Sequence, residues 1–416
     1  MIDIDLLRHN LELVALNMEN RGYDKQIALK AYELDKEWKT KKEKLELLKS
    51  LRNKLNSEIA ELKKAGKDAS EQIAEMRAKG SEIPQLEKEV EMLDRQRKEL
   101  LLLIPNMLHP SVPVAKDDSG NEVVRTWGNP SKTEKDTVPH YDMPGFDFKR
   151  GAKLGGHRFT VLSGWMAKLE RALVNFMLDL HTSKGYKEFW LPLMVKSEIM
   201  QGTGQLPKFA EDLYYVRDDG LWLIPTAEVP LVGMHNSEII EEPLPLFYMA
   251  YTPCFRREAG QYGKDIKGFI RQHQFDKVEL VAIVEPEDSF KTLEKMVSDA
   301  EEVLKLLNIP YRVVKLCSSE VSFASAMTYD LELWIPSQGR YREVGSSSNC
   351  TDFQARRSDL RYRKAGFAAY PHTLNSSGLS VARTLVSLVE NHYEDRGINV
   401  PRVLQPYAKT ERVEMW

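Results

Sequence analysis

The 416-residue sequence has few cysteines, no apolar run long enough to cross a membrane, and no apolar signal segment at its start. Its three cysteines, Cys254, Cys317 and Cys350, form no CxxC pair and cannot all be joined in disulfides. This argues against a structural zinc site and favours a reducing compartment. The aliphatic run at 100–104 is much too short to span a bilayer, and the opening MIDIDLLRHN is polar. We therefore expect a cytoplasmic protein with no membrane partner.

A large charge of one sign is also missing, because 59 basic side chains face 62 acidic ones. A polyanionic partner can therefore bind only through local basic patches. No glycine-rich strand–turn–helix signature appears, and the expected strands and helices do not alternate regularly. The chain is too long for one compact core, so we expect two or three domains. The fold class expected for the larger part is α+β, rich in antiparallel strands.

The first hundred residues carry a repeating apolar pattern with almost no aromatic residues. Apolar positions recur at heptad spacing on two segments separated by the stretch KKAGKDAS, with alternating steps of four and three on the first segment if Lys41 and Arg52 fill its two empty slots. The apolar positions are Leu34, Trp38, Leu45, Leu48, Leu55, Ile59 and Leu62, then Ile73, Met76, Ile83, Leu86, Val90, Leu93, Leu100 and Ile104. This spacing predicts an antiparallel two-helix coiled coil over about 27–104, inside an N-terminal domain at 1–110. A proline-rich linker follows, and we assign 111–416 to a second domain.

The stretch FRREAGQYGKDIKGFIRQHQFDKVEL, residues 255–280, holds two charged clusters around a glycine-bearing loop. Interpreted as strand, loop and strand, it places Arg256 and Glu258 on one face of the first strand. The second strand places five residues on one face: Arg271, His273, Phe275, Lys277 and Glu279. Guanidinium, carboxylate and aromatic groups together suit a nucleotide. Taken alone, however, a solvated hairpin whose charges pair with one another fits better, because short charge patterns are frequent.

Two further stretches favour a ligand site. In HTLNSSGLSVARTLVSLVEN, small residues alternate with larger apolar ones; they are Ser376, Gly378, Ser380 and Ala382. Such a strand has one nearly bare face, which either admits a flat ligand or packs closely on another element. In IPTAEVPL, Thr226 and Glu228 form a polar pair between two prolines, unless the stretch is a bulged edge strand.

The ordered segments MQGTGQLPKF, IPTAEVPL, TPCFRREAG, IRQHQFDKVEL, TYDLELWIP, SNCTDFQARR and VPRVLQPY, preceded by the coiled coil, resemble the seryl-tRNA synthetase family over nearly the whole chain. The resemblance implies the class II synthetase fold, an antiparallel sheet flanked by helices, and a homodimer. A long helix near 165–180 and the strand at Pro192 resemble the first class-defining motif. The charged hairpin resembles the second, and residues 378–383 resemble the third.

The implied reaction has two steps. The carboxylate of L-serine attacks the α-phosphate of ATP, and the seryl group then passes to the 3′ end of tRNA(Ser); tRNA(Sec) is a further possible acceptor. Neither step needs a protein nucleophile, so positioning and charge neutralisation should dominate.

The resemblance assigns three catalytic residues, Arg256, Glu343 and Arg383. Arg256 would bridge the serine carboxylate and the α-phosphate, and Arg383 would cover the adenine and hold the γ-phosphate. Glu258 would accept from the adenine amino group, and Phe275 would stack on the ring. The implied ATP-binding set is Arg256, Arg257, Glu258, Phe275, Glu343, Val344, Gly345, Ser346 and Arg383. Within this set, Glu343 and Ser346 would bind Mg²⁺, which prefers sparse carboxylate and phosphate oxygens.

The implied serine-binding set is Thr226, Ala227, Glu228, Arg256, Glu279, Asn375 and Ser377. Thr226 and Glu228 would hold the ammonium group, while Glu279 and Ser377 would receive the hydroxyl. A site built to pair a hydroxyl rejects alanine, because its buried polar groups would otherwise stay unpaired.

The two-helix coiled coil over about 27–104, here called the arm, would lie against the tRNA and recognise its backbone shape. Its expected phosphate partners are Arg52, Lys54, Lys63, Lys64, Lys67, Arg77 and Lys79, and those of the loop are Lys264 and Lys267. Each of these side chains, taken singly, also fits an ordinary solvated position.

Several positions depart from the commonest family pattern: Arg257, Gly345, Ser347, Ser376 and Ala382. None removes a charged catalytic group, but they leave open how tightly ATP is held. Three rival functions remain: an amino acid ligase that charges a carrier protein on the same scaffold, an inactive paralogue that binds RNA, and a coiled-coil scaffold. The first should lack the arm, the second should have lost a catalytic charge, and the third explains only the arm.

Overall fold

The computed structural model describes residues 1–259 and 268–415. They form two compact units, one spanning residues 2–104 and the other starting at Pro105. The chain thus divides between Ile104 and Pro105, whereas the expected domain boundary lay at 110.

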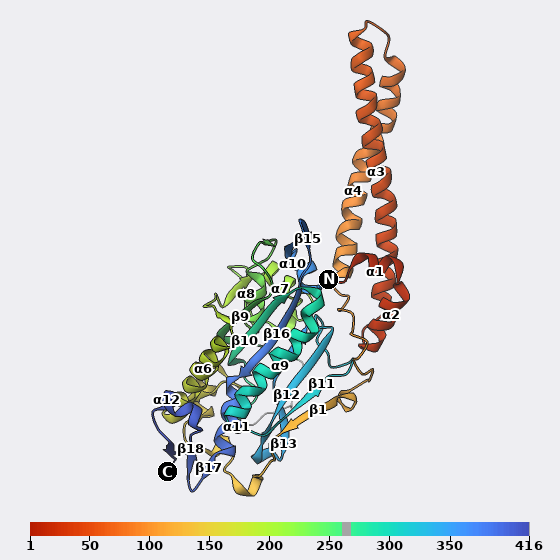
Figure 1. Ribbon diagram of the computed structural model, residues 1–416. Coiled ribbons are helices and arrows are strands. Elements are labelled where there is room, and N and C mark those ends of the chain that lie inside the picture. The colour runs from red at the N-terminus through yellow and green to blue at the C-terminus, as the bar shows by residue number, and fades with distance from the viewer. Residues whose placement is uncertain (260–267, 416) are drawn as a thin grey trace. The chain divides into compact units, whose positions relative to one another are not determined.

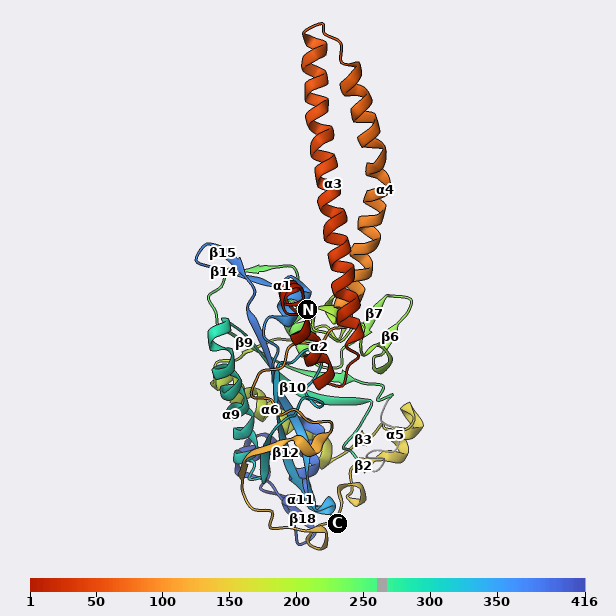
Figure 2. The same ribbon diagram turned by 90° about the vertical axis from the view of Figure 1, so that its right-hand side faces the viewer.

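The first unit consists of two short helices and a long helical hairpin. Its helices are α1 (Ile4–His9), α2 (Leu11–Asn20), α3 (Gln26–Lys64) and α4 (Ser70–Leu101). Figure 2 shows α3 and α4 lying side by side along their length. Leu45 and Leu48 of α3 pack against Ile83 and Leu86 of α4 in a buried cluster. The expected helical hairpin is therefore confirmed, and the four-three spacing correctly identified its inner face.

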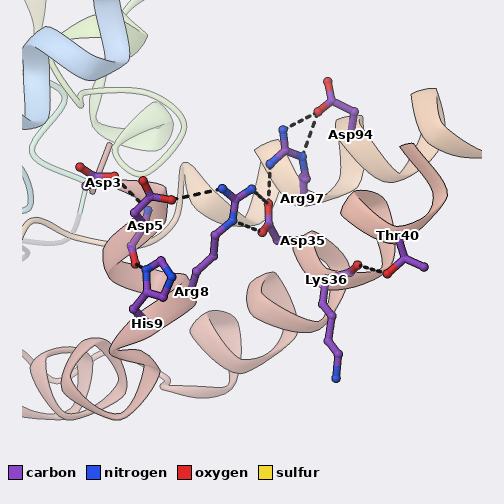
Figure 3. A network of polar contacts seen from close by, with 9 residues as sticks. All are labelled: Asp3, Asp5, Arg8, His9, Asp35, Lys36, Thr40, Asp94 and Arg97. Atoms are coloured by element: carbon purple, nitrogen blue, oxygen red, sulfur yellow. Dashed lines mark hydrogen bonds and ion pairs between the residues drawn. The ribbon is translucent and has the colours of Figure 1, made fainter. Parts of the chain in front are cut away.

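An ionic network joins the helices at the base of this hairpin (Figure 3). The carboxylate of Asp35 on α3 is only 2 % exposed. It accepts from Arg8 Nε of α1 at 2.7 Å and from Arg97 Nη1 of α4 at 2.7 Å. Arg97 also bonds Asp94 and lies 3.6 Å from the centre of the Trp38 ring. One buried acid thus ties three helices together.

The second unit is built around a mostly antiparallel sheet (Figure 1). Among the described residues, eight strands form it in the order β1, β11, β12, β13, β16, β10, β9, β4. Their bounds are β1 (Glu122–Trp127), β11 (Tyr311–Lys315), β12 (Met327–Ile335), β13 (Arg340–Asn349), β16 (His372–Ser380), β10 (Gln274–Val284), β9 (Leu246–Phe255) and β4 (Lys187–Glu188). Only β4 pairs in parallel, with β9, among these described strands. The expected α+β class is confirmed.

Helices cover one face of this sheet. The helices of the unit are α5 (Phe148–Gly155), α6 (Trp165–Ser183), α7 (Ser197–Gly202), α8 (Glu228–Gly233), α9 (Ser289–Leu306), α10 (Phe353–Ser358), α11 (Val381–Asn391) and α12 (Gln405–Ala408). Figure 1 shows α9 running along the strands, and α6, α9 and α11 share one core with them. Val278, Leu280 and Ala282 of β10 point into this core. Because neighbouring side chains alternate, Phe275, Lys277 and Glu279 point to the opposite face.

Smaller elements complete the unit. The short strands are β2 (Phe146–Asp147), β3 (Val161–Leu162), β5 (Met194–Lys196), β6 (Tyr215–Val216), β7 (Leu221–Leu223), β8 (Ile239–Ile240), β14 (Arg361–Lys364), β15 (Phe367–Ala369), β17 (Tyr393–Glu394), β18 (Gly397–Asn399) and β19 (Arg412–Glu414). The 3₁₀ turns include η3 (His140–Asp142) and η6 (Pro336–Gln338). Cys254, Cys317 and Cys350 are buried free thiols. Among residues 1–259 and 268–415, no helix has the length and apolarity needed to cross a membrane.

Candidate active site

A polar cavity of about 460 Å³ opens on the face of the sheet opposite α6, α9 and α11. Strands β10, β12, β13 and β16, the start of α8 and the start of α11 all contribute to its wall. Thirteen of the residues expected at the site line it: Thr226, Glu228, Arg256, Glu258, Phe275, Glu279, Glu343, Val344, Gly345, Ser346, Asn375, Ser377 and Arg383. Residues more than 150 positions apart in the sequence thus meet around one space.

Two expected site residues do not line the cavity. Ala227 is fully buried and packs in a hydrophobic cluster with Leu231 and Val281. Arg257 is exposed, and its backbone N–H donates to the carbonyl of Asp212. The loop lysines Lys264 and Lys267 lie outside the described residues, so their assignment stays a prediction.

The charged hairpin reaches the cavity by a different geometry from the one expected. Strand β9 ends at Phe255 and β10 begins at Gln274, so Arg256 and Glu258 lie beyond the strand. Glu258 has a left-handed φ of 52°, which a strand residue does not adopt. The shared face predicted from strand parity was therefore wrong for this pair. A turn, held by an ion pair between Glu258 and Arg271, brings Glu258 to the cavity instead.

A bulge in β16 corrects the expected bare strand face. Val278 of β10 faces Leu379, but the next residue, Glu279, faces Ser377, so Gly378 is an extra residue in the ladder. Before the bulge, Asn375 and Ser377 line the cavity; after it, Ser380 and Ala382 do. Ser376 and Gly378, expected on the same face as Ser380, do not line the cavity.

Two of the departures from the family pattern are physically coupled. Ser347 of β13 and Ser376 of β16 are cross-strand partners, and their hydroxyl oxygens lie 2.6 Å apart in a fully buried position. A third departure, Gly345, lies against Ser377: a Cβ on Gly345 would stand 2.5 Å from the Cβ of Ser377. The glycine therefore leaves room for a side chain that lines the cavity.

Arg383 and Glu343 meet at one end of the cavity. Arg383 Nη1 donates to the Glu343 carbonyl at 2.7 Å and lies 3.3 Å from its carboxylate, while Nε donates to the carbonyl of Ile270 at 3.1 Å. Desolvation of the carboxylate acts to raise the pKa of Glu343. The charges of Arg383 and Arg256 outweigh this effect and lower the pKa below its ordinary value. Glu343 is thus held as a carboxylate between two cations.

A second acid lies beside this pair. Asp330 of β12 is the cross-strand partner of Ser346, whose hydroxyl lies 3.5 Å from the Glu343 carboxylate. Asp330 Oδ1 is buried and has no hydrogen-bond partner among the described residues. Burial raises the pKa of Asp330 well above its ordinary value, and the charge of Glu343 adds to the effect. Two carboxyl groups and a hydroxyl therefore face one space.

At the other end, the cavity wall around Thr226, Glu228 and Glu279 forms an acidic pocket. Thr226 Oγ1 donates to Glu279 at 2.7 Å and accepts from Lys277 Nζ at 2.9 Å, and Lys277 pairs with Glu279. Beside them, Glu228 accepts from the Asn375 amide at 2.8 Å. Burial and the charge of Glu279 raise the pKa of Glu228 to about 7. This pocket has an excess of carboxylate over ammonium groups.

Arg256 lies between the two ends. Its Nε donates to the carbonyl of Pro225 at 3.2 Å, and its guanidinium lies 5.1 Å from the centre of the Phe275 ring. It forms no ion pair with a carboxylate of residues 1–259 or 268–415. Its charge is therefore available to an anion in the cavity.

Sequence reasoning left four charged wall residues out of the site: Arg271, Lys277, Glu320 and Asp330. Lys277 and Arg271 were expected on the hairpin face but were given no role, and both line the cavity. Lys277 could have been assigned to the cavity, because it is two residues from both Phe275 and Glu279 in β10 and its side chain therefore points to the same face. Asp330 was missed, although the alternation of Thr328, Asp330 and Glu332 in TYDLELWIP places it on the face of Thr328.

The arm presents two classes of lysine. In its middle, Lys41, Lys44 and Lys49 on α3 pair with glutamates of α4 at 3.0, 2.8 and 2.9 Å. Near its tip, Lys63, Lys64 and Lys67 are exposed and form no ion pair within the described parts of the chain, nor does half-buried Arg52. Lys54 and Lys79 instead pair within their own helices.

Comparison with known proteins agrees with this geometry. Residues 1–108 match the family model of the seryl-tRNA synthetase N-terminal domain, and residues 214–392 match the class II core domain of synthetases for G, H, P, S and T. The serine–tRNA ligase of Pseudothermotoga lettingae is 50 % identical over 99 % of both chains. That of Thermodesulfovibrio yellowstonii is 47 % identical over 98 % of both.

Solved structures give the same result. Seryl-tRNA synthetase from Pyrococcus horikoshii, complexed with ATP, superposes with a TM-score of 0.94 at 38 % identity and full coverage of both chains. The cytoplasmic serine–tRNA ligase of Naegleria fowleri, in complex with AMP, gives 0.89 at 31 % identity, covering 100 % of this chain and 99 % of that one. The rival functions receive no support from these relatives. The chain belongs to the seryl-tRNA synthetase family of class II aminoacyl-tRNA ligases.

Proposed function

We propose that this protein activates L-serine with ATP to form seryl-adenylate and pyrophosphate, and then transfers the seryl group to the 3′ end of tRNA(Ser). The carrying observation is the cavity itself. Its wall combines Arg256, which has no carboxylate partner among the described residues, with the Arg383–Glu343 pair at one end and with Glu228 and Glu279 in the acidic pocket. A nucleotide phosphate and an amino acid ammonium group need such different surroundings side by side.

ATP occupies the end that contains Arg383 and Glu343. Arg256, free of carboxylate partners among the described residues, bridges the serine carboxylate and the α-phosphate, where negative charge accumulates during attack. Phe275 stacks on the adenine, Glu258 accepts from its amino group, and Arg383 holds the γ-phosphate. The carboxylate of serine is itself the nucleophile, so the protein contributes alignment and charge neutralisation.

Serine occupies the acidic pocket. Its ammonium group binds to Glu228 and Thr226, and its hydroxyl binds to Glu279 and Ser377. Glu279 is almost fully buried and bonded to Thr226 and Lys277, so a serine hydroxyl at this position joins an existing polar network. Alanine leaves the network incomplete, which is costly in a buried site.

The residues at the end that contains Arg383 and Glu343 fit a magnesium ion. Glu343, Ser346 and the adjacent Asp330 supply hard oxygen donors, and the buried Asp330 Oδ1 has no partner in the described chain. Glu343 and Ser346 would hold the ion, which neutralises phosphate charge when bound. Residues 1–259 and 268–415 contain no cluster of three or more His, Cys, Asp or Glu side chains suited to a metal.

The arm binds the tRNA. Lys63, Lys64, Lys67 and Arg52 near its tip are the phosphate contacts, because opposing glutamates do not neutralise them. We extend the proposal to tRNA(Sec) as an alternative acceptor, since contacts to the RNA backbone carry little sequence information.

We also propose that the protein acts in the cytoplasm as a homodimer. The first-motif elements expose unusually large apolar side chains: Trp190, after β4, is 94 % exposed, and Trp165, at the start of α6, is 37 % exposed. Large exposed aromatic side chains such as these suit a surface that a second copy of the chain covers. Three buried free thiols agree with a reducing compartment.

The test is ATP–pyrophosphate exchange measured separately with each of the twenty amino acids. Serine should support exchange, and alanine should be poorer in kcat/KM by roughly 10⁴-fold, because it lacks the hydroxyl. Faster exchange with another amino acid, or none with any, would refute the proposal.

A further inference from the structure

His140 lies in η3, far along the chain from every residue assigned to the site, and is completely buried. Its Nδ1 lies 2.7 Å from the carboxylate of Glu390 on α11. On the other side of the ring, Nε2 accepts from the backbone N–H of Phe269 at 3.0 Å. The imidazole therefore joins the segment that leads into β10 to the helix that carries Arg383.

These contacts define one protonation state of the ring. A backbone N–H can only donate, so Nε2 must be the unprotonated nitrogen, and Nδ1 carries the proton that goes to Glu390. Glu390 also accepts from the Ser337 N–H at 2.9 Å and from its hydroxyl at 2.9 Å. Burial works to raise the pKa of Glu390, but its bonds to His140 and Ser337 lower it below its ordinary value. The carboxylate thereby fixes the tautomer that can accept from Phe269.

Both partners of His140 lead directly to Arg383. Phe269 is followed by Ile270, whose carbonyl accepts from Arg383 Nε at 3.1 Å. Glu390 lies on α11 seven residues, or about two turns, beyond Arg383. The guanidinium is thus held through its helix on one side and through the Ile270 carbonyl on the other, and His140 connects the two.

We propose that His140 is a positioning residue for Arg383, which it aligns for the terminal phosphates of ATP by clamping Phe269 to α11. The inference rests on the proposed function only in assigning those phosphates to Arg383. A histidine that merely fills the core would affect every ligand alike. A positioning histidine affects the ligand that Arg383 contacts.

Gly268, next to Phe269, is independent evidence that the backbone of this segment lies close to the His140 ring. Gly268 has a φ of 90°, and a Cβ built on it would lie 2.2 Å from His140 Nε2. Alanine at this position must therefore push the ring from its place. Gly366 has nearly the same backbone angle, 87°, but a Cβ there meets nothing within 4 Å. Alanine at Gly366 reproduces the backbone strain without touching His140 and is the matched control.

The test compares binding of ATP and of AMP to the full-length protein by calorimetry in buffer with magnesium. His140→Asn keeps a donor toward Glu390 but loses the acceptor for Phe269. We expect it to weaken ATP binding about tenfold, as for one lost buried hydrogen bond. AMP binding should weaken by less than about twofold, because AMP keeps the adenine that Arg383 covers but lacks the γ-phosphate that Arg383 holds. Equal weakening for both nucleotides, or no weakening, would overturn the inference.

A double variant separates positioning from a general loss of structure. If His140 acts through Arg383, His140→Asn should add nothing to the loss of ATP affinity caused by Arg383→Ala. Additive losses would contradict the inference.

Should His140→Asn fail to fold, Gly268→Ala decides the question: it should weaken ATP selectively, while Gly366→Ala should not. These titrations need no serine. An absence of serine-dependent exchange would therefore refute the proposed function without bearing on His140.

Discussion

On the arm, Lys44 and Glu82 form an ion pair whose side chains are 58 % and 56 % exposed, whereas in the cavity Lys277 and Glu279 pair with exposures of 9 % and 2 %. Water screens the first pair, so it contributes little to stability. The second pair has lost its water and persists only because further polar groups, such as Thr226, complete its bonds. The same two residue types thus support a helical surface in one unit and a selective pocket in the other.

This contrast also separates the two substrates. The cavity holds charges fixed by hydrogen bonds and ion pairs, three of them buried, which suits small ligands that must be aligned closely. The tip of the arm holds exposed lysines without opposing acids, which suits the regular phosphate array of an RNA. Changes in one unit should therefore affect one step of the reaction and spare the other.

The largest effect should follow from Arg256→Ala. This removes the cavity cation that has no carboxylate partner in the described chain, and serine-dependent pyrophosphate exchange should fall by roughly 10³-fold. Lys67→Ala, which removes an exposed arm cation, is the control and should leave exchange unchanged. Near-normal exchange by Arg256→Ala would mean that this cavity cation does not serve the first step.

A smaller but still large effect should follow from Asp35→Ala. Two guanidinium groups at the base of the arm would lose their shared acid, at a cost of about 3–5 kcal/mol to the N-terminal unit. Denaturant unfolding monitored at Trp38 should report the loss, while pyrophosphate exchange should stay normal. A parallel loss of exchange would break the proposed independence of the two units.

A moderate effect should distinguish the two classes of arm lysine. The triple variant Lys63→Ala, Lys64→Ala, Lys67→Ala should raise the KM for tRNA about tenfold and reduce its salt dependence. The matched triple variant at Lys41, Lys44 and Lys49 removes the same charge from lysines that are paired with glutamates. It should raise the KM for tRNA much less. Equal effects would show that net charge, not its placement, governs tRNA binding.

An effect of similar size, spread over two pH units, should appear in the pH dependence of serine binding. Glu228 has a raised pKa of about 7, and only its carboxylate form can pair with the ammonium of serine. Its ionised fraction falls as the pH falls, so the KM for serine should rise roughly tenfold between pH 8 and pH 6. Glu228→Gln should have a higher KM without this slope. A flat profile in the unaltered protein would remove Glu228 from the ammonium site.

The two units also differed in how far the sequence could predict them. The arm follows from a local repeat, so the spacing of Leu45, Leu48, Ile83 and Leu86 was enough to identify its buried face. In the cavity, strand alternation correctly grouped Phe275, Lys277 and Glu279 on one face of β10, because that strand is regular there.

Local irregularities caused the errors. The bulge at Gly378 reversed the faces of the residues after it, and the left-handed turn at Glu258 replaced the expected strand. Asp330 and His140 were missed because their importance comes from partners distant in the sequence. Ala227 was included because it lies between Thr226 and Glu228, but its side chain points into the core.

The central claim is that the arm serves tRNA and the cavity serves adenylate formation. It is tested most directly by replacing residues 34–93 with a short flexible linker and measuring both pyrophosphate exchange and tRNA charging in one preparation. We expect exchange within about twofold of the full chain and charging reduced by at least about 10²-fold, since the phosphate contacts are gone. An equal loss of both activities would show that the arm serves folding, and undiminished charging would show that tRNA binds elsewhere.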